Sequence, residues 1–153
     1  FRSGLDALKN YFKVYKEKLG EPIKLEEQFS LKLAGVTLVG KIDRIDRTEN
    51  GYELVDYKTG SLKKKQEVTS DDQLSIYAIA AKEVLGIETK TQAFYFIEEN
   101  EKVETTRTES QLEKKKKALE NTIEEMKVSD FPAKPGFPCQ FCEFNKICPF
   151  VAK

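Results

Sequence analysis

Apolar positions recur along the chain with two different periods, so both helices and strands are expected. A helical spacing of about 3.6 residues runs through residues 1–19, 71–85 and 109–127. Short apolar or alternating runs predict strands at residues 24–33, 38–46, 52–59, 91–98 and 102–106. Residues 60–70 are polar and Lys-rich and predict a loop, and the Pro-rich residues from 131 onward predict a loop-rich tail. This order of elements indicates an α/β or α+β fold with a mixed sheet.

The composition narrows the possible chemistry. The chain has 153 residues, with 26 Lys and Arg, 26 Asp and Glu, and no His. The lack of His excludes Ser–His and Cys–His catalysis within this chain, so chemistry falls to carboxylates, Lys, Tyr or Cys. A net charge of zero does not exclude nucleic acid, because partners respond to the local field. There is no membrane-length apolar run and no secretory signal, so we expect a cytoplasmic protein with no membrane partner.

Two acidic strands joined by a hairpin carry the candidate chemistry. Asn-Gly at residues 50–51 predicts a two-residue turn, which places Asp43 directly opposite Lys58. Because side chains alternate along a strand, Asp43, Asp56 and Lys58 then point to one face. Two carboxylates suit Mg²⁺ or Mn²⁺, and a neighbouring Lys can stabilise negative charge that develops on a phosphate. The alternative interpretation is a solvated hairpin held together by salt bridges.

The residues of this hairpin match a known family. Gly-Lys-Ile-Asp-Arg-Ile-Asp at 40–46, followed by Asp-Tyr-Lys-Thr-Gly at 56–60, resembles the RecB-like nucleases of the PD-(D/E)XK superfamily. Gln73 and Tyr77 match the family's Gln-x-x-x-Tyr motif on one face of a helix, and Glu26 matches its upstream acidic position. The resemblance implies a restriction-endonuclease-like core, with a central mixed β-sheet flanked by helices.

The same resemblance implies roles for individual residues. Asp43, Asp56 and the backbone carbonyl of Tyr57 would bind Mg²⁺ or Mn²⁺, and Lys58 would be the catalytic lysine. Gln73 and Tyr77 would brace the site or contact DNA. For Glu26 the neighbouring Glu27 is an alternative, and for Tyr77 the alternative is ordinary core packing. The implied catalytic set is Glu26, Asp43, Asp56, Lys58, Gln73 and Tyr77.

All three cysteines lie in the tail, at a C-x₂-C-x₅-C-P spacing. An odd number of Cys at this spacing, without a secretory signal, indicates metal binding rather than disulfides. Zinc, an iron–sulfur cluster and free buried thiols are the alternatives. The spacing resembles the iron–sulfur members of the same family, which implies a 4Fe-4S cluster on Cys139, Cys142 and Cys148. Those members have a fourth Cys upstream and many have an upstream His, so we expect residues before Phe1 to be missing.

Lysine runs and aromatic residues add little that is specific. Residues 63–65 are three lysines directly after the Asp-Tyr-Lys motif, where they could attract phosphate or form an ordinary solvated loop. Lysines 114–117 are interspersed with Glu on a predicted helix, which favours a solvated face. Phe-Tyr-Phe at 94–96 belongs to a predicted strand and favours core packing over base stacking.

These features predict a nuclease core at residues 1–130 and a Cys-containing tail at 131–153 that packs on it. The expected activity is divalent-metal-dependent hydrolysis of DNA, as an exonuclease of DNA repair and recombination. A helicase domain or subunit would be the partner, or the protein would be related to the CRISPR-associated exonucleases. The first alternative is a non-cleaving DNA-binding or scaffolding module with the same fold. The second, a zinc-ribbon-tailed interaction domain, leaves the Asp-Tyr-Lys motif unexplained.

Overall fold

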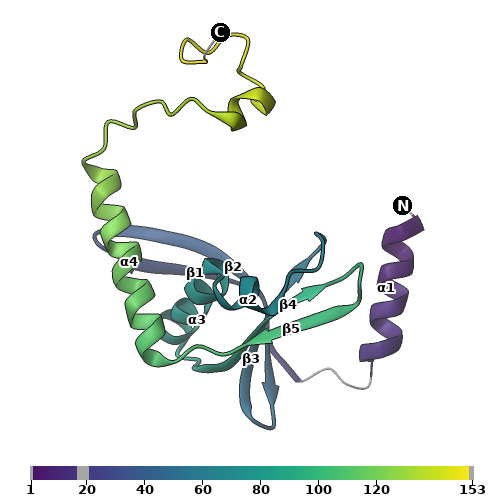
Figure 1. The fold of residues 1–153 in the computed structure, drawn as a ribbon. Coiled ribbons are helices and arrows are strands. Elements are labelled where there is room, and N and C mark those ends of the chain that lie inside the picture. Colours follow the sequence, from purple (N-terminus) through teal and green to yellow (C-terminus); the bar gives the residue numbers. More distant parts are fainter. Residues whose placement is uncertain (1, 17–20, 152–153) are drawn as a thin grey trace.

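The computed structural model describes residues 2–16 and 21–151, which form a five-stranded sheet with helices around it (Figure 1). In chain order the elements are α1 (Arg2–Tyr15), β1 (Glu21–Leu33), β2 (Val36–Thr48), β3 (Gly51–Lys58), α2 (Lys65–Thr69), α3 (Asp72–Leu85), β4 (Thr89–Phe96), β5 (Glu101–Thr105), α4 (Glu109–Lys127) and the 3₁₀ turn η1 (Phe137–Phe141). Every predicted helix and strand is present, which confirms the α+β fold with a mixed sheet. The predicted end of the first helix at residue 19 lies outside the described residues.

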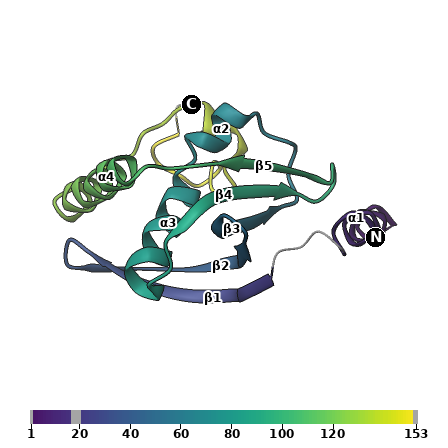
Figure 2. The same cartoon turned by 90° about the horizontal axis from the view of Figure 1, so that it is seen from below.

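The sheet is antiparallel except at its centre. The strand order is β1-β2-β3-β4-β5, as Figure 2 shows, and β3 and β4 are the parallel pair. Parallel neighbours need a crossover connection, and α2 with α3 supplies it. α3 contacts β1, β3 and β4, and α4 packs against α3. The crossover therefore brings the first turn of α3 to the end of β3.

One stretch of the crossover was predicted wrongly. Residues 60–70 were expected to be a loop, but they contain α2, whose Val68 is fully buried. Five residues are too few to show a helical period in the sequence. The Glu67 carboxylate accepts a hydrogen bond from the Lys64 backbone N–H at 2.9 Å, which closes the start of this short helix.

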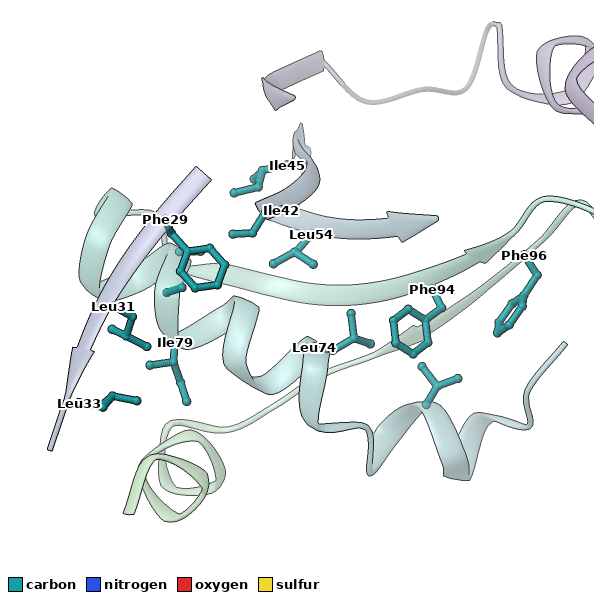
Figure 3. Close-up of a cluster of buried hydrophobic side chains, with 13 residues drawn as sticks. Phe29, Leu31, Leu33, Ile42, Ile45, Leu54, Leu74, Ile79, Phe94 and Phe96 are labelled. Atoms are coloured by element: carbon teal, nitrogen blue, oxygen red, sulfur yellow. The ribbon is translucent and has the colours of Figure 1, made fainter. Parts of the chain in front are cut away.

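The core lies between the sheet and α3 (Figure 3). Phe29, Leu31 and Leu33 alternate with exposed residues along β1 and so share one face. From α3, Leu74 and Ile79 are buried against this layer. Full burial of a side chain such as Leu74 contributes about 2 kcal/mol, and it anchors the first turn of α3.

Gly40, the first residue of the acidic hairpin motif, is required by packing. A Cβ at residue 40 would lie 2.5 Å from the Phe29 ring, far inside contact distance. In the sheet register Gly40 is paired with Phe29 itself. The ring therefore lies over the glycine backbone, which explains a Gly in this position without any catalytic role.

The hairpin register differs by two residues from the prediction. The pairs are Thr48 with Gly51 and Arg44 with Val55, so residues 49–50 form the turn, and Asp43 does not face Lys58. The predicted turn needs positive φ at both Asn50 and Gly51, but of these two only Gly51 has it, at 119°. A shift of two preserves the alternation of faces in a regular ladder, but the pairing ends at Arg44, so a face shared by Asp43 with Asp56 and Lys58 stays a prediction.

The two ends of the chain contribute little to the core. On α1 the predicted apolar face is largely exposed, including Leu8 at 58% and Phe12 at 67%. The tail extends away from the sheet in Figure 1, and Phe137 and Phe141 are exposed. The predicted division into a core at residues 1–130 and a tail at 131–153 that packs on it stays a prediction. The described part of the chain contains no helix that combines the length and the apolar character needed to cross a membrane.

Candidate active site

The candidate site is built at the end of β3, where its last residues run beside β4. Asp56 is 3% exposed and pairs in register with Phe94, and Lys58 pairs with Phe96. Side chains two apart on a strand share a face, so Asp56 and Lys58 point together toward the side that α3 covers. Leu54, on the same face, is fully buried and fixes this end of the strand to the core.

Lys58 is held by three neighbours. Its Nζ lies 2.7 Å from Asp56 Oδ2 and donates to Gln73 Oε1 at 2.7 Å. It also lies 4.6 Å from the centre of the Phe94 ring, a distance at which a cation and an aromatic face attract. Phe94 was predicted as a core residue, and it is completely buried. Its ring also contacts the Lys58 ammonium.

Gln73 and Tyr77 join the site from the first turns of α3. Gln73 Nε2 donates to Asp56 Oδ1 and contacts the Tyr77 hydroxyl, both at 2.9 Å. Its Oε1 faces Lys58, so both ends of the amide have complementary partners. The Tyr77 ring packs edge-on against Phe29 at 5.8 Å, so this residue serves the core and the site together.

The environment of the buried Asp56 carboxyl raises its pKa. Burial raises the pKa of Asp56, Lys58 lowers it, and the charges of Asp43 and Asp71 raise it further. Asp56 Oδ2 is fully enclosed and accepts no aligned hydrogen bond from the described residues, with Lys58 beside it only as an ion-pair partner. The Lys58 ammonium already supplies one cation to this oxygen, so a metal ion at Asp56 would share or replace that contact.

Asp43 supplies a second carboxylate. The β2–β3 pairing ends at Arg44 with Val55, one residue before Asp43, and the charge of Asp43 is close enough to raise the pKa of Asp56. Asp43 Oδ2 accepts a hydrogen bond from the Tyr57 backbone N–H at 2.9 Å. The Tyr57 side chain belongs to the other face, where its hydroxyl lies 2.8 Å from that of Tyr11 on α1. The proposed role of the Tyr57 carbonyl as a metal ligand stays a prediction.

Glu26 lies on β1 between the residues paired with Ile42 and Arg44, and so next to Asp43 in the register, but it does not join the aspartates in a three-ligand group among the described residues. It is exposed, has a positive φ of 51°, and forms an ion pair with Lys41. Glu27, the alternative, pairs with Lys24 at 3.0 Å. Among residues 2–16 and 21–151, no three acidic, His or Cys side chains gather closely enough to hold a metal. The donor set at the site is therefore two carboxylates, and the role of Glu26 stays a prediction.

Residues 2–149 match the sequence profile of the PD-(D/E)XK nuclease superfamily. This chain belongs to that superfamily. No curated protein matches it significantly. Among solved structures it is similar to the crystal structure of SSO0001, with a TM-score of 0.50 and 18% sequence identity over 98% of this chain and 68% of the other. At that identity the likeness concerns the fold alone.

The cysteines of this PD-(D/E)XK domain do not form the predicted cluster site. Cys139, Cys142 and Cys148 are free thiols, and within the described residues they are not brought together as a three-ligand group. Cys139 Sγ instead accepts a weak contact from the Gly136 N–H at 3.4 Å. The predicted 4Fe-4S site therefore does not fit the tail as described here.

Sequence reasoning missed the role of Asp71 at the site and considered its partner Lys63 only within a run of lysines. Asp71 caps α3 by accepting from the Gln73 N–H at 2.9 Å, and its other oxygen lies 3.2 Å from Lys63. Lys63 in turn lies 5.5 Å from the Phe94 ring. The signal for Asp71 was visible as an Asp directly before a helix, but its second role beside Asp56 needed the fold.

Proposed function

We propose that this PD-(D/E)XK domain is a divalent-metal-dependent DNA nuclease. The observation that carries the proposal is the array of Asp56, Lys58 and Gln73, with the enclosed Asp56 Oδ2 and the carboxylate of Asp43 nearby. A solvated hairpin of surface salt bridges, the alternative left open by the sequence, does not account for a carboxylate that is 3% exposed and is bound by both Lys58 and Gln73.

Asp43 and Asp56 would hold the metal. Mg²⁺ and Mn²⁺ prefer oxygen ligands and are commonly bound by one or two protein carboxylates, with water and substrate phosphate completing the shell. Such an ion polarises the phosphoryl oxygen and lowers the pKa of bound water. Binding would also relieve the charge repulsion between the two carboxylates that helps to raise the pKa of Asp56.

The chain's own residues would orient the reacting groups. Lys58 presents an ammonium whose direction is set by Gln73 Oε1 and by the Phe94 ring. A fixed positive charge beside the phosphate would stabilise negative charge that develops as the bond breaks. Gln73, bound to Asp56 and Lys58 together, keeps the two at a constant spacing.

A basic groove beside the site supports DNA as the substrate. It has a volume of about 520 Å³ and is lined by residues 62–65 and 101–104, which include four lysines and two glutamates, with Lys102 paired to Glu53 and Glu104. Lys63 belongs both to this groove and to the surroundings of Phe94. Within the described residues Lys64 and Lys65 form no ion pair with the protein, so their charges are available to a phosphate backbone.

Exonuclease action, a role in DNA repair or recombination, and a helicase domain or subunit as partner are finer proposals that rest on the RecB-like motifs. A 4Fe-4S cluster rests on cysteine spacing alone, and it would need a rearranged tail and a fourth ligand. Anaerobically purified protein is then expected to contain iron that Cys139→Ser removes. Iron content unaffected by this substitution would count against a cysteine-bound cluster.

A non-cleaving DNA-binding module is the second candidate. It is favoured because polar groups of the site bind one another: Lys58 donates to Gln73, and Asp43 accepts from the Tyr57 backbone N–H. A nuclease would exchange some of these contacts for metal and phosphate.

Cleavage of labelled single- and double-stranded DNA with Mg²⁺ or Mn²⁺ separates the two candidates. We expect cleavage by the unsubstituted protein and its loss in Asp56→Ala and Lys58→Ala. Lys114→Ala, at an exposed position on α4, is the matched control and should cleave normally. Cleavage that survives both site substitutions would contradict the proposal. Binding of DNA without cleavage by the unsubstituted protein would support the scaffolding module.

A further inference from the structure

We infer that Arg107 is a positioning residue for Gln73, an inference that rests on the proposed nuclease function. Arg107 lies between β5 and α4, directly before Thr108, the residue that caps α4. Nothing in the acidic motifs of the sequence points to it. The fold nevertheless brings its side chain to the turn between α2 and α3, from which the site residue Gln73 projects.

The guanidinium of Arg107 joins four separate pieces of the chain. Nε donates to Ser75 Oγ on α3 at 2.8 Å. One terminal nitrogen donates to three backbone carbonyls at the end of α2 and the start of α3, those of Val68 and Thr69 at 3.2 Å and Asp71 at 3.0 Å. The other makes a longer contact of 3.5 Å with Gln92 Oε1 on β4.

All of these acceptors are neutral oxygens. Burial lowers the pKa of Arg107, which the more distant charges of Asp71 and Asp72 partly offset. An Arg side chain stays protonated in proteins, so partial burial of this guanidinium costs desolvation free energy. Among the described residues no contacting carboxylate offsets that cost. The arrangement is explained if the function of the guanidinium is to hold these three backbone carbonyls in place.

One of these carbonyls, that of Asp71, connects Arg107 to Gln73. The Asp71 carbonyl accepts from Arg107 and also from Ser75 Oγ at 3.2 Å. The Asp71 side chain accepts from the Gln73 N–H at 2.9 Å and so begins α3. Arg107 therefore fixes the backbone from which Gln73 reaches Asp56 and Lys58.

Gln73 needs such support because its amide must be aligned at both ends. Oε1 meets an ammonium and Nε2 meets a carboxylate, each within 2.9 Å, so a small rotation or translation weakens both. A shift of about 1 Å at a catalytic group can lower a rate roughly a hundredfold. Lysine cannot replace Arg107, because a single ammonium lacks the planar fork that serves Ser75 and three carbonyls together.

A double-mutant cycle with Arg107→Lys and Gln73→Ala tests the inference on labelled DNA, with all proteins assayed well below their unfolding temperatures. We expect Arg107→Lys to lower kcat about tenfold to a hundredfold with little change in KM. In the Gln73→Ala background the same substitution should change kcat by less than about twofold. An equal loss in both backgrounds would overturn the inference, because Arg107 would then act independently of Gln73.

Two further variants separate positioning from simple loss of stability. Ser75→Ala removes the Nε acceptor and the bond from Ser75 Oγ to the Asp71 carbonyl but leaves the three bonds from Arg107 to backbone carbonyls, so it should show a smaller loss of kcat with the same dependence on Gln73. Gln111→Ala breaks the capping box of α4 next to Arg107 and should lower the unfolding temperature without lowering kcat. A kcat loss in Gln111→Ala as large as that in Arg107→Lys would also overturn the inference.

Hydrogen exchange makes the inference testable apart from cleavage. In Arg107→Lys the Gln73 amide should exchange faster, while the Ile42 amide in the β1–β2 hairpin keeps its rate. An equal change at both amides would indicate global destabilisation and would contradict positioning. If the unsubstituted protein cuts no DNA, the proposed nuclease function fails, and the exchange result still decides whether Arg107 orders the Gln73 backbone.

Discussion

β3 carries two buried carboxylates paired with lysines, and they differ in one informative way. Glu53 is 8% exposed, and both of its oxygens accept from Lys102, at 3.0 and 3.1 Å. Asp56 is 3% exposed, and its Oδ2 accepts no aligned hydrogen bond among the described residues although Lys58 lies beside it. Burial raises the pKa of both carboxyls, and the paired lysine opposes the shift in each.

Burial and ion pairing alone therefore do not distinguish the candidate site. What distinguishes Asp56 is the amide of Gln73, which binds the carboxylate and the lysine together, and an Oδ2 whose contact is the Lys58 ion pair alone. A nearby carboxylate is common to both, because Asp43 raises the pKa of Asp56 and Asp46, paired with Glu53 in the register, raises that of Glu53. Both oxygens of Glu53 accept from Lys102, and Gln73 does not reach it. The comparison makes Glu53 a control for Asp56, a buried and lysine-paired carboxylate on the same strand but on its other face.

The largest expected difference between the two carboxylates is in cleavage. Asp56→Asn keeps the shape but removes a charged metal ligand, so we expect the rate to fall at least about a hundredfold. Glu53→Gln should leave the rate nearly unchanged. Initial rates at saturating Mg²⁺, with Mn²⁺ binding measured by calorimetry, check both. Similar losses in the two variants would show that burial, and not the site, controls activity.

The sequence contained most of this site because its signals are local. Asp56 and Lys58 share a face through strand alternation, and Gln73 and Tyr77 share one through helical spacing, so short motifs place each pair. The hairpin register was wrong because Asn-Gly was taken as the turn. The two-residue turn with positive φ at both positions is Ala34-Gly35, at 45° and 74°. Ala is not a residue that signals such a turn.

Other features could not be read from the sequence because they depend on distant contacts. Arg107 binds backbone carbonyls that lie 36 to 39 residues away, and any residue type supplies a carbonyl. The bond from Gln73 to Asp56 depends on how the first turn of α3 meets the end of β3. The apolar period of α1 predicted a buried face, yet Leu8 and Phe12 are exposed, because a period says nothing about which surface covers it.

Gln73 provides the next test of the comparison. Gln73→Leu keeps the volume but removes the bonds to Asp56 and Lys58, so we expect kcat to fall about tenfold to a hundredfold. Gln66→Leu, on the exposed surface of α2, is the control and should leave kcat unchanged. A Gln73→Leu protein with normal kcat would mean that the Asp56–Lys58 pair, like Glu53–Lys102, keeps its geometry without a third residue.

A smaller effect is expected from the groove lysines. Replacing Lys64 and Lys65 together by Gln should weaken single-stranded DNA binding by at most about tenfold at physiological salt. The slope of log K against log salt should become shallower by about 0.7 for each lost phosphate contact. The same replacement at Lys114 and Lys117, exposed on α4, should do neither. Equal effects of the two replacements would show that DNA binding depends on general surface charge and not on this groove.

The smallest difference concerns stability against pH. The pKa of Asp56 is raised in the folded state from its usual 3.8, chiefly by burial, with Asp43 and Asp71 adding to the effect and Lys58 opposing it. The folded protein then binds this proton more tightly than the unfolded chain, so ionisation destabilises the fold above the folded pKa, and the penalty disappears as pH falls below the unfolded value. Asp56→Asn should therefore be the more stable protein at neutral pH, and its advantage should shrink toward pH 4, as urea unfolding of both proteins would measure. An advantage that grows with acidification would reverse the sign of the shift and make Lys58, rather than burial, the dominant influence on Asp56.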